Sequence, residues 1–213
     1  MTTTRVERTP GSSPGGSLGK VSSPSSSQVW NLPNILTMLR IVLVPFFAWF
    51  LLADDGAQGP WRWAALAVFV VAMYTDKLDG DIARARGLIT DFGKIADPIA
   101  DKLLTGTAFV ILSVLGQIPW WATLIILIRE WGITLLRLVV IRYGVIPASS
   151  GGKIKTVLQT VVLFLYLLPF TAQWQWLGVV AFILLLATVA VTLVTGLQYI
   201  LQSIRLIRAG SRD

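Results

Sequence analysis

Four aspartates stand close together in a chain that carries only 11 acidic residues. They are Asp76, Asp79, Asp97 and Asp101. Residues three or four apart on a helix share a face, so Asp76 pairs with Asp79 and Asp97 pairs with Asp101. Two such helices packed antiparallel would point all four carboxylates into one small volume. The spacing therefore predicts a site for divalent cations.

A cluster of this kind is costly unless a cation neutralises it. An acidic side chain deep in a bilayer costs about 2.5–3.5 kcal/mol, and carboxylates held together also repel one another. Mg²⁺ or Mn²⁺ removes both penalties, because hard cations take carboxylate oxygens and keep positions open for phosphate and water. The alternative is a solvated polar loop with incidental acids, which accounts for the acids but not for their helical register.

The spacing around the aspartates is similar to that of a known enzyme family. The pattern D-x-x-D-G-x-x-A-R, then eight residues, then G-x-x-x-D-x-x-x-D is the signature of the CDP-alcohol phosphatidyltransferases. This chain matches it without gap or substitution at Asp76, Asp79, Gly80, Ala83, Arg84, Gly93, Asp97 and Asp101. The runs 31–47, 128–137 and 151–156 also resemble members that use sn-glycerol 3-phosphate, particularly actinobacterial ones. The resemblance covers roughly residues 30–204.

The resemblance implies a reaction and a role for each signature residue. The reaction is transfer of a phosphatidyl group from CDP-diacylglycerol to sn-glycerol 3-phosphate, with release of CMP, by a homodimer. Asp76, Asp79 and Asp97 would hold two divalent cations, Mg²⁺ or Mn²⁺. Asp101 would complete the metal shell and act as the general base. The residues expected at CDP-diacylglycerol are Gly80, Ala83, Arg84, Thr90 and Gly93.

The first apolar segment adds polar residues at helical spacing. Asn34, Thr37 and Arg40 fall at i, i+3 and i+6. We expect Asn34 and Thr37 to lie near the nucleotide of CDP-diacylglycerol. The alternative for Thr37 is a hydrogen bond from its hydroxyl back to its own helix.

Four cations elsewhere in the chain are candidates for the acceptor phosphate. They are Arg129, Arg137, Lys153 and Lys155. A guanidinium can hold two phosphate oxygens at once, and the two lysines follow a pair of glycines at an expected helix start. The alternatives are that Arg129 pairs with Glu130 or with an aspartate of the cluster, and that the lysines only flank a membrane span.

Composition indicates which kind of protein holds these residues. The 213 residues suggest one domain; 54% are hydrophobic, 14% are charged, and the mean hydropathy is +0.71. Soluble domains carry about 25% charged residues, so we expect an integral membrane protein. The chain has no cysteine and no histidine, which excludes disulfides, thiol nucleophiles and a histidine base. We interpret the net charge of +7 as membrane topology and an anionic substrate rather than nucleic-acid binding.

The expected fold is an all-α integral membrane protein with six transmembrane helices. Residues 1–28 are predicted to form a disordered cytosolic tail, and residues 29–213 the catalytic domain. A short amphipathic helix from Val29 would lie at the interface before the first span. Because about 20 apolar residues span a bilayer, the predicted spans are 34–53, 61–84, 95–116, 119–141, 155–172 and 176–204.

Charge and tryptophan patterns predict the orientation of the spans. Lysines and arginines gather at one set of span ends, which the positive-inside rule places in the cytosol together with both termini and the aspartates. The tryptophans at the other ends would form an outer aromatic belt: Trp61, Trp63, Trp120, Trp121, Trp174 and Trp176. The resemblance to actinobacterial members implies that this membrane is the plasma membrane of a bacterium, where the chain contacts membrane lipid.

Two kinds of alternative function remain open at this point. Other members of the family use an inositol phosphate or phosphatidylglycerol as the acceptor, although spare cations favour a phosphorylated acceptor. An ion-coupled transporter would also place acids inside a helical bundle, but nearer the middle of the membrane and often on broken helices.

Overall fold

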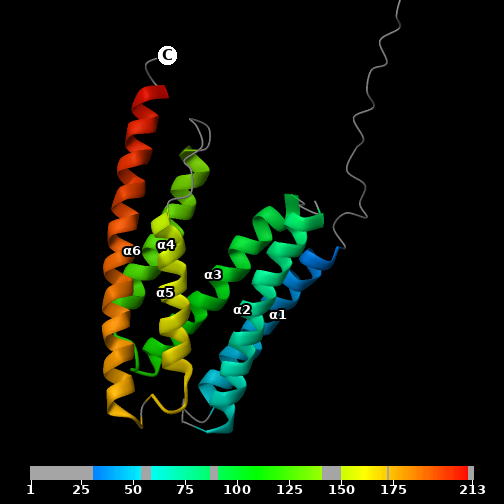
Figure 1. The fold of residues 1–213 in the computed structure, drawn as a ribbon, viewed down its shortest axis with the longest axis vertical. Helices are drawn as coiled ribbons and strands as arrows, with labels where there is room; N and C mark the ends of the chain where they lie inside the picture. Colours follow the sequence, from blue (N-terminus) through cyan, green and yellow to red (C-terminus); the bar gives the residue numbers. More distant parts are fainter. Residues whose placement is uncertain (1–30, 54–58, 87–90, 141–149, 172, 211–213) are drawn as a thin grey trace, which may run out of the picture.

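The chain folds into long helices that follow the predicted spans closely (Figure 1). The computed structural model describes residues 31–53, 59–86, 91–140, 150–171 and 173–210, and within these it contains six α-helices and no strand. The helices are α1 (Leu32–Leu52), α2 (Pro60–Arg86), α3 (Asp91–Val114), α4 (Trp120–Val140), α5 (Ser150–Leu167) and α6 (Gln175–Gly210). The predicted tail, 1–28, lies outside the described residues.

Helix α1 corrects one prediction. We expected a separate interfacial helix from Val29, but from Leu32 a single helix runs without a break to Leu52. Asn31 caps it by accepting a hydrogen bond from the Asn34 N–H at 3.0 Å, and a proline occupies the first turn, where its missing N–H costs nothing. The amphipathic segment is therefore the first part of α1.

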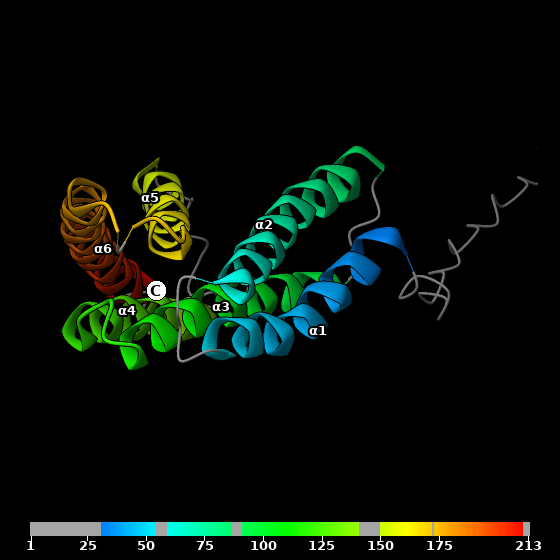
Figure 2. The ribbon, with the colours of Figure 1, turned by 90° about the horizontal axis from the view of Figure 1, so that it is seen from below.

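The helices pack in two groups that α3 connects. Helix α1 packs against α2 and α3, whereas α6 packs against α4 and α5 (Figures 1 and 2). The buried core contains the large apolar side chains Phe47, Leu51, Phe69, Leu104, Phe109, Leu112, Ile126 and Leu163. Both groups contribute to this core, so the chain forms one packed unit.

A buried arginine ties several elements together near the start of α2. Arg62 is 1% exposed and donates to Gln117 Oε1 at 2.5 Å, to the Tyr166 carbonyl at 2.5 Å and to the Leu167 carbonyl at 3.3 Å. Gln117 is brought there by Gly116, whose φ of 70° ends α3 in the left-handed conformation that glycine adopts without strain. Arg62 thus joins α2 to the α3–α4 turn and to the end of α5.

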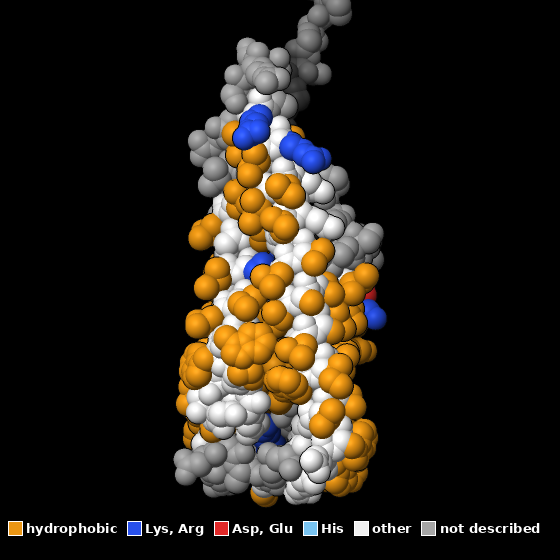
Figure 3. Space-filling view, turned by 90° about the vertical axis from the view of Figure 1, so that its left-hand side faces the viewer, with side chains coloured by type: hydrophobic (Ala, Val, Ile, Leu, Met, Phe, Trp, Pro, Cys, Tyr) orange, Lys and Arg blue, Asp and Glu red, His pale blue; other side chains and the backbone are white. Residues whose placement is uncertain are grey.

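Large apolar side chains cover much of the surface. Figure 3 shows them along most of the face that carries α6, with Lys and Arg side chains near the C-terminal end. Within the described residues, two segments are long and apolar enough to cross a membrane, Leu32–Leu52 and Gln175–Arg208, and the apolar segment Ile154–Leu167 is shorter. Helices α2, α3 and α4, which carry charged candidate residues, do not meet the same criterion. All six tryptophans of the predicted belt are exposed.

Candidate active site

Helix α1 presents an arginine to the first two aspartates of the signature. Arg40 is 1% exposed. It donates from one terminal nitrogen to Asp76 Oδ1 and from the other to Asp79 Oδ2, each at 2.5 Å. Asp76 and Asp79 share one face of α2, as their spacing predicts, and this face meets α1. Charge-assisted hydrogen bonds of this kind are about twice as strong as neutral ones, so the three side chains form a firm cluster.

One turn before Arg40, helix α1 also reaches α3. The Thr37 hydroxyl lies 2.5 Å from Asp97 Oδ1 and 3.1 Å from the Pro33 carbonyl of its own helix. A hydroxyl has one proton to donate, so these two acceptors compete, and the shorter contact is the one to the carboxylate. Thr37 is fully buried. Three of the four signature aspartates are therefore held by two neighbouring side chains of α1.

Asp101 is within electrostatic range of charged groups on four other helices: Arg40 on α1, Asp76 on α2, Glu130 on α4 and Lys155 on α5. Its side chain is half-buried. The position links the aspartates of α2 and α3 to a second cluster on α4 and α5.

The donor chemistry of the aspartate cluster suits a hard divalent cation. Carboxylate oxygens from α2 and α3 approach the same part of α1, and Arg40 places a positive charge between Asp76 and Asp79. In the described part of the chain, however, no three acidic side chains are arranged to hold one ion. The carboxylates of Asp76 and Asp79 are instead turned toward the guanidinium.

The remaining predicted CDP-diacylglycerol residues lie along the same helices. Asn34 is buried on α1, and Gly80 is half-buried directly after Asp79. Ala83 and Arg84 belong to the last part of α2, and Gly93 to the first turn of α3, but what surrounds these three residues lies outside the description. Thr90 also lies outside them.

The second cluster is organised by Glu130. Its Oε1 accepts hydrogen bonds from Lys155 Nζ, from Arg129 at 3.3 Å and from Gln159 at 3.5 Å. Arg129 also donates to the Thr195 hydroxyl at 3.1 Å. The aliphatic part of Arg129 passes close to α6: a Cβ at position 196 would lie 3.1 Å from Arg129 Cγ, so a larger residue than Gly196 would require the arginine to shift. The pairing of Arg129 with Glu130, one of the alternatives considered, is present.

The four predicted acceptor cations do not all meet. Arg129 and Lys155 converge on Glu130, whereas Arg137 is exposed and lies over the Tyr199 ring, 5.8 Å from its centroid. Lys153 is in the first turn of α5, and its side chain is outside the described residues. The structure therefore groups two of the four cations.

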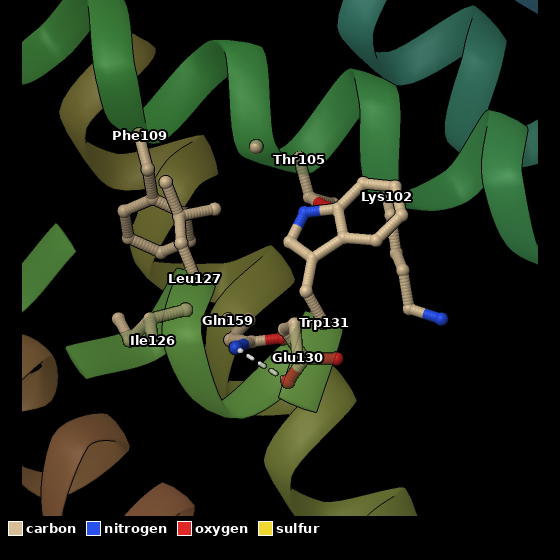
Figure 4. Close-up of a pocket in the computed structure, with 9 residues that line it drawn as sticks. Lys102, Thr105, Phe109, Ile126, Leu127, Glu130, Trp131 and Gln159 are labelled. Carbon is tan, nitrogen blue, oxygen red and sulfur yellow. Dashed lines mark hydrogen bonds between the residues drawn. The ribbon is translucent and has the colours of Figure 1, made fainter. Parts of the chain in front are cut away.

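A small pocket opens beside the Glu130 cluster (Figure 4). Helices α3, α4 and α5 line it with Lys102, Thr105, Gly106, Phe109, Ile126, Leu127, Glu130, Trp131 and Gln159. Lys102 follows Asp101 and lies 6.0 Å from the Trp131 ring centroid. The pocket is polar on the side of Lys102 and Glu130 and apolar on the side of Phe109 and Ile126.

Sequence reasoning missed three of the residues that organise these clusters. The spacing of three between Thr37 and Arg40 places both on one face of a helix, but it does not identify the partners of Arg40. The sequence indicates Glu130 only as a neighbour of Arg129. Gln159 stands one turn after Lys155, a spacing that also indicates a shared face.

Comparisons with known proteins agree with the signature. The sequence model for CDP-alcohol phosphatidyltransferase matches residues 30–194. A probable phosphatidylglycerophosphate synthase of Mycobacterium tuberculosis is 46% identical over 179 residues, or 84% of each chain. The CDP-diacylglycerol–glycerol-3-phosphate 3-phosphatidyltransferase of Bacillus subtilis is 39% identical, over 67% of this chain and 80% of its own length. The protein of the same name from Rickettsia typhi is 36% identical over 79% of this chain and 94% of its own.

Proposed function

This chain belongs to the CDP-alcohol phosphatidyltransferase family, and from that premise we propose that it transfers the phosphatidyl group of CDP-diacylglycerol to sn-glycerol 3-phosphate. The products are phosphatidylglycerophosphate and CMP. The names of the relatives from Bacillus subtilis and Rickettsia typhi support this donor and this acceptor. The observation that carries the proposal is that Asp101 is within electrostatic range of both charged clusters, Arg40 with Asp76 and Glu130 with Lys155.

The cations around Glu130 suit a phosphorylated acceptor. Arg129 and Lys155 bind the Glu130 carboxylate, and Lys102 and Asp101 are within electrostatic range of it. Three cations against two carboxylates leave one net positive charge, which favours the arrival of an anionic phosphate. A guanidinium and an ammonium together fix both the charge and the orientation of such a group.

The metal-ligand set follows from the signature. Asp76, Asp79 and Asp97 would hold two divalent cations, Mg²⁺ or Mn²⁺, and Asp101 would complete the shell. The carboxylate oxygens that these side chains gather around one part of α1 support this assignment. When bound, the cations would neutralise the pyrophosphate and stabilise the charge that develops during transfer.

Different residues of the chain then bind the acceptor phosphate and accept the proton. Arg129 and Lys155 hold the acceptor phosphate, and Asp101 accepts the proton of the acceptor hydroxyl. That hydroxyl oxygen forms a bond to the phosphorus that carries diacylglycerol, and the bond from this phosphorus to the bridging oxygen breaks. CMP leaves with the bridging oxygen and its electron pair. Asp101 suits the base role because it is within electrostatic range of both charged clusters and the chain has no histidine.

We further propose that all six helices cross a bacterial plasma membrane, as a homodimer, with both termini and the aspartates on the cytosolic side. The exposed apolar side chains and the exposed tryptophans at the starts of α2, α4 and α6 support this arrangement. Single cysteines can be introduced cleanly because the chain has none. A cysteine at Ser150 should be labelled from the cytosolic side only, and one at Gln173 from outside only. Reversed labelling would overturn the orientation.

The reaction is tested by release of CMP from CDP-diacylglycerol by purified protein. The acceptors compared are sn-glycerol 3-phosphate, an inositol phosphate and phosphatidylglycerol, each with and without Mg²⁺. We expect turnover with sn-glycerol 3-phosphate only, and none after metal removal. Turnover with another acceptor would keep the family chemistry and reject the proposed acceptor. Ion-driven transport in vesicles without CMP release would reject the enzyme assignment.

A further inference from the structure

Arg40 occupies an unusual electrostatic position. It is a fully buried charged side chain on a helix that is otherwise apolar enough to cross a membrane. Its two terminal nitrogens bind different carboxylates, Asp76 and Asp79, one turn apart on α2. Its third nitrogen, Nε, is buried and has no hydrogen-bond partner among the described residues. The guanidinium is thus held by charge at two of its nitrogens and left incompletely bonded at the third.

The oxygens that Arg40 binds belong to the expected metal ligands. Asp76 Oδ1 and Asp79 Oδ2 each receive a hydrogen bond from the guanidinium at 2.5 Å. A carboxylate oxygen that directs its lone pair to an N–H cannot give the same lone pair to a metal ion. A divalent cation entering between Asp76 and Asp79 would also stand close to the fixed positive charge of Arg40. Arg40 and the cation therefore compete for the same site.

The cluster needs a positive charge before any metal arrives. Asp79 is buried and within electrostatic range of Asp76 and Asp97. Removing one partner of a buried ion pair strongly destabilises a protein, because the other charge remains buried without compensation. Arg40 supplies the compensation from within the chain, in the place where a metal ion would supply it from solution.

We propose that Arg40 is an internal counter-cation that holds the metal-ligand carboxylates together in the metal-free protein and releases at least one of them when a divalent cation binds. Arg40 is thereby a positioning residue, and metal binding is coupled to movement of its guanidinium. The inference rests on the proposed function only in that divalent cations bind the signature aspartates. It makes no use of the identity of the acceptor.

The test is binding of Mn²⁺, measured by electron paramagnetic resonance on purified protein without substrates, together with melting temperatures in EDTA and in Mn²⁺. In Arg40→Gln the competing cation is gone, so Mn²⁺ should bind about 10-fold more tightly. This factor corresponds to one charge-assisted hydrogen bond that Mn²⁺ no longer has to displace. The same variant should melt at a lower temperature than wild type in EDTA, and Mn²⁺ should recover most of the loss.

Arg62→Gln is the matched control, because Arg62 is equally buried but binds carbonyl and amide oxygens instead of carboxylates. It should lower the melting temperature by the same amount in EDTA and in Mn²⁺, and it should leave Mn²⁺ affinity unchanged. Mn²⁺ binding to Arg40→Gln that equals wild type or is weaker would overturn the proposal, because Arg40 would then assist the site instead of competing for it.

Arg40→Lys decides the matter if Arg40→Gln does not fold. Its ammonium keeps the charge but cannot bind both carboxylates in the forked geometry, so Mn²⁺ affinity should again exceed that of wild type, by a smaller factor. Affinity at or below wild type would overturn the proposal. Asp97→Asn separates this inference from the proposed function. If Asp97→Asn binds Mn²⁺ as wild type does, the metal site itself is misassigned. If only the Arg40 variants depart from expectation, the metal site stands and the role of Arg40 falls.

Discussion

Among the described residues, the bundle buries two arginines toward its opposite ends, and their partners differ in kind. Arg62, near the start of α2, binds two carbonyl oxygens and the amide oxygen of Gln117. Arg40 binds two carboxylates near the other end of the same helix. Each guanidinium is 1% exposed, so burial alone does not distinguish them. The chemistry of the partner does.

Neutral oxygens and carboxylates respond differently to a ligand. The carbonyls of Tyr166 and Leu167 belong to the end of α5, and Gln117 belongs to the turn that follows α3. These oxygens are neutral, so an arriving cation attracts them less strongly than it attracts a carboxylate. The carboxylates of Asp76 and Asp79 are negatively charged, and a divalent metal ion can bind them in place of Arg40. We therefore expect the contacts of Arg62 to stay the same when a ligand binds. At the other end, we expect a divalent metal ion to replace the guanidinium of Arg40 at one or both carboxylates. The following changes test that contrast, beginning with the largest expected effect.

Asp97→Asn should abolish turnover. Asp97 is the signature aspartate of α3 that contacts α1, through Thr37, and an amide cannot replace its negative charge at a metal. The protein should remain folded, because an amide oxygen still accepts the hydrogen bond from Thr37. The measurement is CMP release at ordinary Mg²⁺ on protein whose helical content matches wild type. Activity near the wild-type level would mean that the metal site does not include Asp97.

Asp101→Asn should lower kcat by about 10²–10⁴-fold, the usual effect of losing a general base. Binding of CDP-diacylglycerol should change much less, because Asp76, Asp79 and Asp97 remain. Kinetics with the donor varied at saturating acceptor measure both quantities. Equal losses in donor binding and in turnover would make Asp101 chiefly a metal ligand.

Arg129→Ala should raise the KM for sn-glycerol 3-phosphate by roughly 10–150-fold, corresponding to a lost charge-assisted contact of about 1.5–3 kcal/mol. The KM for CDP-diacylglycerol should move much less. Arg137→Ala is the comparison, because Arg137 is exposed and lies over Tyr199, away from the Glu130 cluster. A larger effect at Arg137 than at Arg129 would show that the acceptor phosphate binds outside that cluster.

The sequence predicts a helix boundary correctly where the apolar segment and the helix end at the same residues. The fourth span was predicted at 119–141, and α4 covers Trp120–Val140. The fifth was predicted from 155, but α5 begins at Ser150, because its first turns contain polar and small residues that a hydropathy criterion leaves out. For the same reason α6 continues to Gly210, past Arg205 and Arg208, beyond the predicted end at 204.

The candidate site was predictable within each helix but not between helices. Spacing placed Asp76 and Asp79 on one face, and Thr37 and Arg40 on one face. It did not show that these two faces meet, because contacts between residues 36 or more positions apart depend on how α1 packs against α2 and α3. The same limit applies to Glu130 and Lys155, which come from different helices and meet only in the folded bundle.

Arg62→Gln should have the smallest effect on catalysis and a clear effect on stability. The substitution removes a charge that no described carboxylate balances, but it also leaves the Tyr166 and Leu167 carbonyls and the Gln117 amide with fewer donors. A buried acceptor left without its partner costs about 1–3 kcal/mol, and the new amide can satisfy one of the three. We therefore expect a lower melting temperature in detergent, with kcat and both KM values unchanged at temperatures where the protein is folded. Thermal unfolding and steady-state kinetics on the same preparation measure the two properties together. A change in the KM for sn-glycerol 3-phosphate without loss of stability would contradict the contrast between the two arginines, because the fixed end of the bundle would then communicate with the acceptor site.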